Sequence, residues 1–421
     1  MAFYELLTSS CLLNNMGLVY NATTNTFANK PGVETRVRDF GGLTGVDWVD
    51  HTDDLFGWTL VCCRAQAARS NTAILTLFLS PQVFGEMIKS LEEVGFVRNV
   101  TLFGAPFRWV LHLQGIVDSE FGEDMKALVE RAFVAAGNKK VHIITHSYGG
   151  LTAVYWMNNF LPAGFANKAA WHAWIKSRVA SFVPIAGPFS GTAKALRSLL
   201  SGDTFGAPDF LINRENMLPD VRTIGGAVQL VPDPGFWAQD FNFVVTPTKN
   251  YTATNMRAAM TDSGADVSAS IFDHTHSIID SLEQPPVQTY CMFGFGIPTE
   301  IAYHYDEPLN RTKIVQPALV DSSDLGDGTV PMMSLLECQF WEELDPSVDD
   351  VRCREYKLDS AGHADLDNAD IIRDVALIGT GKVPFVGCNA TTLDAHIDSL
   401  EPAKVPRKAQ QVRALKRRNK K

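Results

Sequence analysis

The stretch K-K-V-H-I-I-T-H-S-Y-G-G-L, residues 139–151, decides the fold predicted for this chain. Residues 141–144 are mostly apolar and β-branched, which predicts a buried strand. Residues 148–156 open with Tyr-Gly-Gly and predict an apolar helix. Ser147 lies at the turn between them, on a tight bend that exposes its hydroxyl. A strand, a serine turn and a helix in this order are typical of a nucleophile elbow, G-x-S-x-G, although Thr145 replaces the first glycine.

An elbow of this kind belongs to the α/β-hydrolase fold, in which an acid and then a histidine follow the serine along the chain. Asp327 lies in L-G-D-G-T-V-P, after a candidate sheet strand at residues 315–321, and its glycines allow a sharp backbone bend. We predict Asp327 as the acid. Asp321 and Asp324 are close alternatives, and Asp-Gly also serves as a turn that merely ends a strand.

His363 lies in S-A-G-H-A-D-L-D-N, a glycine-containing loop ahead of a predicted helix at residues 370–378. A loop can place an imidazole over Ser147. His142 and His146 lie on the strand beside the elbow and fit this position less well. We therefore predict His363 as the base.

These residues define a chemistry. His363 would take the proton of Ser147, and Asp327 would fix the imidazole tautomer and stabilise the imidazolium, giving an acyl-enzyme. His274 and His276 are two residues apart, but no third ligand follows at a zinc-like spacing. We expect no metal and no cofactor.

Strands and helices alternate around the elbow, which predicts a mostly parallel, doubly wound sheet. The predicted helices are 82–94 and 122–136, and the predicted strands are G-L-V-Y-N and V-E-T-R-V near the start, T-L-F-G-A-P (101–106), 178–188 and 287–294. The periodicity fades over residues 191–285, which are rich in Phe, Trp and Pro. We expect a mobile cap over an apolar site there, the alternative being a long surface excursion.

With 421 residues, 46% hydrophobic and 20% charged, the chain can bury a large core. Its net charge is −10, yet residues 402–421 carry nine lysines and arginines and no acid. This basic tail is expected to be disordered, or to tether the protein to an anionic surface. We expect no nucleic-acid partner. No apolar run reaches the ~18 residues of a transmembrane helix.

Two features favour the secretory route, although the first residues do not form a convincing signal peptide. The chain has seven cysteines, an odd number that leaves one unpaired. It also has five N-x-[ST] sequons, which are glycosylation candidates at Asn21, Asn99, Asn250, Asn310 and Asn389.

Together these segments resemble the lecithin:cholesterol acyltransferase family, which also contains a lysosomal phospholipase and phospholipid:diacylglycerol acyltransferases. The resemblance covers most of the chain and depends on many motifs in one order. They are G-L-V-Y-N, K-P-G-V-E-T-R-V, L-F-G-A-P-F-R-W, I-T-H-S-Y-G-G-L, I-A-G-P-F-S-G-T, T-P-T-K-N-Y-T-A, Y-C-M-F-G-F-G-I-P-T, G-D-G-T-V-P and G-H-A-D-L.

The resemblance implies an α/β-hydrolase fold with an inserted cap, and it places the family's catalytic triad on the serine, aspartate and histidine predicted above. It also implies that the backbone N–H of Tyr148 is one oxyanion donor and that Cys291 and Cys338 form a disulfide. The implied partners are phospholipid and lipid-acceptor substrates at a membrane or lipoprotein surface.

The chain also departs from the family. Family members begin with a strand and a P-G-x-x-G loop that supplies a second oxyanion donor, and this chain is expected to enter the pattern downstream of both, without the signal peptide. Cys11 would then lack its usual partner. Residues 57–77 have no family counterpart, and residues 38–41 and 108–110 differ from the family motifs; a mistaken exon boundary is our hypothesis for the unmatched segment.

Six regions are predicted: 1–56, a partial family segment; 57–77, the unmatched insertion; 78–190, the first part of the hydrolase core; 191–285, the cap; 286–400, the second part of the core; and 401–421, the basic tail. The expected function is transfer of a fatty acyl chain from a phospholipid to an alcohol such as a sterol, through Ser147. A phospholipase with the same triad is the first alternative. A truncated, weakly active or inactive lipid-binding remnant is the second. The expected location is the secretory pathway, either extracellular or in a lysosomal or vacuolar lumen.

Overall fold

The computed structural model describes residues 17–33, 37, 39–44, 46, 84–203, 214–280, 284–344, 351–356, 361–382 and 410. Some predictions therefore lie outside the described residues: the segment 57–77, the tail apart from Gln410, Cys11 and Asn389.

The central sheet has four strands in the order β10-β7-β4-β3, and every neighbouring pair is parallel. The strands are β3 (Val141–His146), β4 (Val179–Ile185), β7 (Thr289–Gly294) and β10 (Val351–Tyr356). β4 and β7 are apolar and buried along almost their whole length, as expected of parallel strands that are covered on both faces. The predicted parallel sheet is confirmed.

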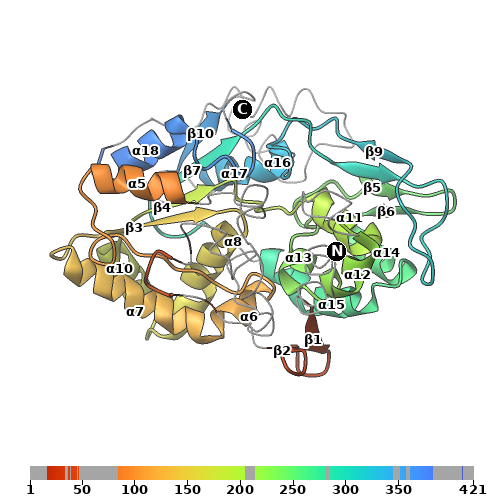
Figure 1. Cartoon of the computed structure of the whole chain (residues 1–421), viewed down its shortest axis with the longest axis horizontal. Helices are drawn as coiled ribbons and strands as arrows, with labels where there is room; N and C mark the ends of the chain where they lie inside the picture. Colours follow the sequence, from red (N-terminus) through yellow and green to blue (C-terminus); the bar gives the residue numbers. More distant parts are fainter. Residues whose placement is uncertain are drawn as a thin grey trace, which may run out of the picture.

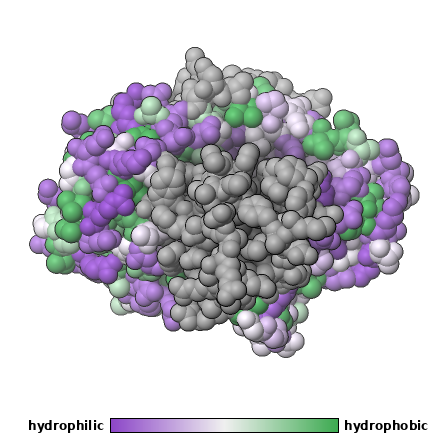
Figure 2. Space-filling model, viewed as in Figure 1, coloured by the Kyte–Doolittle hydropathy of each residue, from purple (hydrophilic) through white to green (hydrophobic). Residues whose placement is uncertain are grey.

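Helices cover both faces of this sheet (Figure 1). Helices α5 (Gly85–Glu93) and α18 (Ala369–Gly379) lie on one face, and α7 (Glu120–Ala135), α8 (Tyr148–Tyr155) and α10 (Lys168–Arg178) lie on the other. The buried residues of α7 recur at helical spacing, and its other face is more exposed; they are Gly122, Met125, Leu128, Val129 and Ala132. Hydrophilic side chains accordingly dominate the surface at the left of Figure 2, over α7 and α10.

Between α8 and α10 the chain continues through a π-helical turn (Trp156–Phe160) and the short helix α9 (Leu161–Ala163). Helix α6 (Leu113–Val117) precedes α7, and α16 (Met332–Leu335) and α17 (Glu337–Leu344) follow the predicted acid. A hairpin of β1 (Leu18–Asn21) and β2 (Thr26–Asn29) lies at the start of the described chain.

The described residues of the segment 191–285 form a second layer beside the central sheet, at the right of Figure 1. Their helices are α11 (Ala193–Ser201), α12 (Arg214–Val221), α13 (Gly225–Gln229), α14 (Met256–Asp262) and α15 (Asp266–Asp280), with a 3-10 turn at Ala253–Asn255. A second sheet has the order β6-β5-β8-β9, from strands β5 (Asn242–Val245), β6 (Asn250–Thr252), β8 (Ala302–His304) and β9 (Leu319–Asp321).

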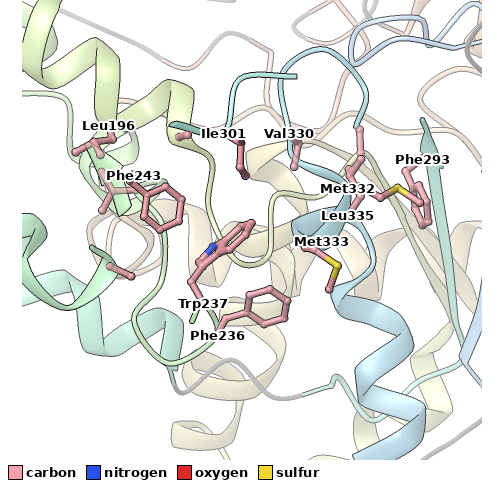
Figure 3. Close-up of a cluster of buried hydrophobic side chains, with 14 of the residues drawn as sticks. Leu196, Phe236, Trp237, Phe243, Phe293, Ile301, Val330, Met332, Met333 and Leu335 are labelled. Atoms are coloured by element: carbon pink, nitrogen blue, oxygen red, sulfur yellow. The ribbon is translucent and has the colours of Figure 1, made fainter. Parts of the chain in front are cut away.

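One apolar core joins this layer to the central sheet (Figure 3). Phe236 and Trp237, from the loop after α13, pack in the same cluster as Phe293 of β7 and Met332 of α16. Trp237 is 2% exposed, and its indole N–H donates to the Ser190 carbonyl at 2.8 Å. The region predicted as a cap therefore shares its core with the rest of the fold.

The disulfide implied by the resemblance is present. Cys291 in β7 and Cys338 in α17 are bonded, with their Cα atoms 6.4 Å apart. Both residues are buried, and the bond fixes α17 against the central sheet.

Two strand predictions are wrong. T-L-F-G-A-P forms no strand, since only an isolated bridge from Arg98 to Leu102 is present there. Gly104 instead approaches a turn, where a Cβ on it would lie 2.2 Å from the Gly42 carbonyl oxygen, and Pro106 cannot donate to a sheet.

Of residues 315–321, only the last three form a strand, β9, and this strand pairs with β8 in the second sheet instead of the central sheet. Pro317 removes a backbone donor just before it. Near the start, G-L-V-Y-N is confirmed as β1, which pairs with the antiparallel strand β2. Most of V-E-T-R-V lies outside the described residues.

Candidate active site

The turn after β3 has the strained backbone of a nucleophile elbow. Ser147 has φ 51° and ψ −125°, a left-handed conformation that a side chain rarely adopts. Two backbone hydrogen bonds hold it: its N–H donates to the Ile185 carbonyl at 2.9 Å, and its carbonyl accepts from Gly150 N–H at 2.9 Å. Such strain persists where the surrounding structure enforces it, and it is common at active sites.

The departure from G-x-S-x-G has a steric explanation. Thr145 and Gly149 face each other across the turn, and a Cβ added to Gly149 would lie 3.5 Å from the Thr145 Cβ. This separation is ordinary van der Waals contact. A threonine at position 145, where the motif has its first glycine, therefore does not crowd Gly149, the second glycine of the motif. The degenerate motif therefore still forms the elbow.

The structure brings the three predicted residues together. His363 Nε2 lies 3.0 Å from Ser147 Oγ, and His363 Nδ1 lies 2.8 Å from Asp327 Oδ2. Because a carboxylate only accepts, Nδ1 carries the hydrogen and Nε2 is left to accept the serine proton. The side chain of Asp327 is fully buried, whereas that of His363 is 16% exposed and can reach a substrate.

Asp327 is fixed by its own loop. Its Oδ1 accepts from Thr329 N–H at 3.0 Å and from Val330 N–H at 2.7 Å, which turns Oδ2 toward the histidine. Asp324 instead accepts from Met332 N–H at 2.7 Å, at the first residue of α16. Since both ring nitrogens of His363 are already paired, neither of the alternative acids, Asp321 and Asp324, has a position on the imidazole.

Two threonines that the sequence did not single out support the acid loop. The hydroxyl of Thr299 accepts from Gly328 N–H at 2.9 Å and donates to the Ile297 carbonyl at 2.8 Å. Thr192 donates to the Thr329 carbonyl at 2.6 Å. Thr299 ends G-I-P-T, part of a motif that the chain shares with the family. Its place in that motif was the only sign in the sequence that it has a role at the site.

Gly294, at the end of β7, was also missed. A Cβ on it would lie 1.9 Å from the Ala361 carbonyl oxygen, far inside any allowed contact. Glycine is therefore required for the loop that carries His363 to approach the sheet.

The predicted oxyanion donor lies at the start of α8. The first N–H groups of a helix have no partner within the helix and carry its positive dipole end. The hydroxyl of the Tyr148 side chain is buried in the protein. It lies 3.3 Å from the Leu111 carbonyl and 3.2 Å from Gln229 Oε1. Burial raises the pKa of this phenol well above its usual value, so it stays neutral. Its side chain thus anchors the backbone that follows Ser147.

Among the described residues, no group of three or more His, Cys, Asp and Glu side chains is arranged to hold a metal ion. His276 Nδ1 instead pairs with the Phe272 carbonyl at 2.8 Å, within its own helix.

A parallel sheet that passes through a strained serine into a helix, with a histidine and a buried aspartate beside it, defines the α/β-hydrolase class. The family model of lecithin:cholesterol acyltransferase matches residues 2–281 and 273–370. The chain therefore belongs to the lecithin:cholesterol acyltransferase family.

Individual relatives are distant. The chain is 27% identical to the phosphatidylcholine-sterol acyltransferase of Mus musculus over 79% of its length and 66% of that protein. It is 26% identical to the lysosomal phospholipase A and acyltransferase of Rattus norvegicus over 79% of its length and 70% of that protein. It thus spans about two thirds of these relatives.

Solved structures show weaker likenesses. A chain of the Tle4–Tli4 complex is 14% identical, covers 65% of both chains and has a TM-score of 0.36. A meta-cleavage product hydrolase is 16% identical over 71% of this chain and 85% of that one, with a TM-score of 0.30.

Proposed function

We propose that this protein is an acyltransferase that moves a fatty acyl chain, expected from the sn-2 position of a phospholipid, to an alcohol acceptor such as a sterol. The observation that carries the proposal is the continuous hydrogen-bonded chain Ser147–His363–Asp327, with donor and acceptor separations of 3.0 and 2.8 Å. Membership of a family whose relatives are named as acyltransferases and phospholipases supports a lipid ester as the substrate.

In the first half-reaction, Ser147 Oγ attacks the ester carbonyl while its proton passes to His363 Nε2. The imidazolium that forms is stabilised by Asp327, whose carboxylate lies on Nδ1. Tyr148 N–H donates to the developing oxyanion. The lysophospholipid oxygen leaves with the proton from Nε2, and the acyl group remains on Ser147.

In the second half-reaction, the acceptor hydroxyl gives its proton to His363 Nε2 and attacks the acyl carbonyl. The bond from the acyl group to Ser147 Oγ breaks, Oγ takes the proton back from Nε2, and the new ester is released. Water can replace the alcohol, and the product is then a free fatty acid. A phospholipase A-type hydrolase is therefore the second candidate, and the rat relative named as both phospholipase and acyltransferase favours it. The acceptor that enters the site decides between the two.

Three observations support a location in the secretory pathway. The Cys291–Cys338 disulfide is of the kind that persists in oxidising compartments. The four sequon asparagines within the described residues are all exposed: Asn21, Asn99, Asn250 and Asn310. The two relatives named above are an acyltransferase of phosphatidylcholine and sterol and a lysosomal enzyme. The lipid substrate would be met at a membrane or lipoprotein surface, and no described helix is long and apolar enough to cross a bilayer.

The test uses vesicles of phosphatidylcholine labelled in the acyl chain, with and without a sterol, beside a Ser147→Ala control. Labelled sterol ester formed only by the unsubstituted protein supports the transferase. Labelled fatty acid alone supports the phospholipase. Product levels equal to those of the Ser147→Ala control in every arm would refute both activities and favour a lipid-binding remnant.

A further inference from the structure

His146, the residue directly before Ser147, contacts the loop that carries the histidine of the triad. Its Nε2 lies 2.7 Å from the His363 carbonyl oxygen, and the two imidazole rings are 5.0 Å apart between centroids. A carbonyl can only accept, so Nε2 of His146 carries the hydrogen and donates it. This contact joins residues 217 positions apart in the chain.

We propose that His146 is a positioning residue for the reaction, which holds the His363 imidazole within reach of Ser147 by binding the His363 backbone. The inference rests on the proposed function, because it concerns the rate at which Ser147 is activated. It adds a residue outside the predicted triad.

The backbone of His363 is held from two sides. Its N–H donates to the Asp327 carbonyl at 2.9 Å, and its carbonyl accepts from His146. The first bond ties the histidine to the acid, and the second ties it to the strand that ends at Ser147. Together these two bonds fix the distance between Asp327 and Ser147, and the His363 imidazole spans this distance.

Hydrogen bonds within the loop cannot replace this contact. Asp365 N–H donates to the Gly362 carbonyl at 3.2 Å, and Leu366 N–H donates to the Ala364 carbonyl at 2.8 Å. Such bonds shape the loop, but they do not set its position relative to β3. The bond from His146 does, because it starts on that strand.

The charge of His146 also suits this role. The pKa of His146 is lowered to about 4, chiefly by burial and next by the neighbouring His363, while the hydrogen bond to the His363 carbonyl and the charge of Asp327 oppose the shift. His146 is therefore neutral near pH 7. When His363 becomes an imidazolium during the reaction, it faces a neutral ring instead of a second cation at 5.0 Å.

A partly buried strand histidine can also be a purely structural residue, and the chain offers such a case for comparison. His142 lies on the same face of β3, four residues earlier, since side chains alternate along a strand. Its Nδ1 lies 2.8 Å from Ser181 Oγ, in the adjacent strand β4. His142 is thus a matched control on the same element.

The experiment compares His146→Gln and His146→Met, two side chains of similar size of which only glutamine has an N–H to donate. His142→Met is the control. A fluorophosphonate probe reacts covalently with an activated serine, so its second-order labelling rate at Ser147 reports activation without any lipid acceptor. The kcat and KM for a short p-nitrophenyl ester and the thermal midpoint are measured on the same full-length proteins.

We expect His146→Met to lower the labelling rate and kcat by about 10- to 100-fold with little change in KM, because a misplacement of about 1 Å can cost about 100-fold. His146→Gln should recover most of this loss, and His142→Met should label at the unsubstituted rate. Rates are referred to the folded fraction, so a loss of stability does not imitate the effect.

Two failures are distinguishable. If the unsubstituted protein is labelled no faster than a Ser147→Ala variant, the proposed function itself is wrong. If the unsubstituted protein is labelled but His146→Met reacts equally fast, or His146→Gln is no better than His146→Met, the positioning role is overturned.

Discussion

Replacing Asp327 by asparagine tests the acid of the triad with almost no change in shape. In the structure, Oδ1 of Asp327 accepts from two backbone N–H groups, those of Thr329 and Val330, and Oδ2 lies on His363 Nδ1. The amide oxygen of an asparagine has to take the Oδ1 position, because an NH₂ group there would face two donors. The NH₂ group is then directed at His363.

An NH₂ group opposite Nδ1 requires that nitrogen to accept, so the hydrogen moves to Nε2. Nε2 can then no longer take the proton of Ser147. In serine proteases an aspartate-to-asparagine change of this kind lowers kcat by about 10⁴ through the wrong tautomer. We expect a similar loss here, which corresponds to about 5 kcal/mol of transition-state stabilisation.

Asp324→Asn is the matched control, because Asp324 was one of the two alternative acids and its carboxylate accepts from Met332 N–H. An asparagine oxygen can accept that bond equally well, so activity should stay within about threefold, given that neutral hydrogen bonds of this kind contribute only about 1 kcal/mol. The assay is p-nitrophenyl ester hydrolysis with thermal unfolding in parallel. Near-normal turnover in Asp327→Asn, or a large loss in Asp324→Asn, would refute the assignment of the acid.

Three further predictions concern stability and loop placement. Gly294→Ala should lower the free energy of unfolding by about 1–3 kcal/mol, because its Cβ would overlap the Ala361 carbonyl; urea unfolding measures this, and the fluorophosphonate labelling rate should fall as well. Replacing both Cys291 and Cys338 by serine opens a loop with a sequence separation of 47 and should cost about 4 kcal/mol in the chain-entropy model, seen as a lower urea midpoint. Trp237→Ala should cost about 3–5 kcal/mol, since it empties a buried site and removes one of the two N–H groups that donate to the Ser190 carbonyl; an unchanged urea midpoint would show that this core is not tightly packed.

The parts of the fold that the sequence predicted are those with local signals. The apolar run before Ser147 and the glycines after it specify a strand, a turn and a helix within about a dozen residues. The order of serine, acid and histidine then restricted the search to a few loops. Asp327 was preferred over Asp321 and Asp324 because of its glycines and the candidate strand before it, the family resemblance implied the same residue, and the structure brings Asp327 to His363.

The parts of the fold and of the site that could not be predicted from the sequence depend on contacts between residues far apart in the chain. Thr299 contacts Gly328 across 29 positions, and His146 contacts His363 across 217. Periodicity carries no information on such pairs. The strand predicted at T-L-F-G-A-P failed for a related reason, because the close approach of Gly104 to Gly42 decided the backbone there, and this contact is not a local preference.

The position of the acid loop limits how the region predicted as a cap can move. Val330 and Met332, three and five residues after Asp327, lie in the same apolar cluster as Leu196 of α11 and Trp237. Thr192, just before α11, donates directly to the acid loop. A rotation of residues 191–285 as one body would separate these contacts and displace the carboxylate from His363. We therefore expect the packed core of this region to stay fixed relative to the acid loop, which keeps Asp327 within hydrogen-bonding distance of His363.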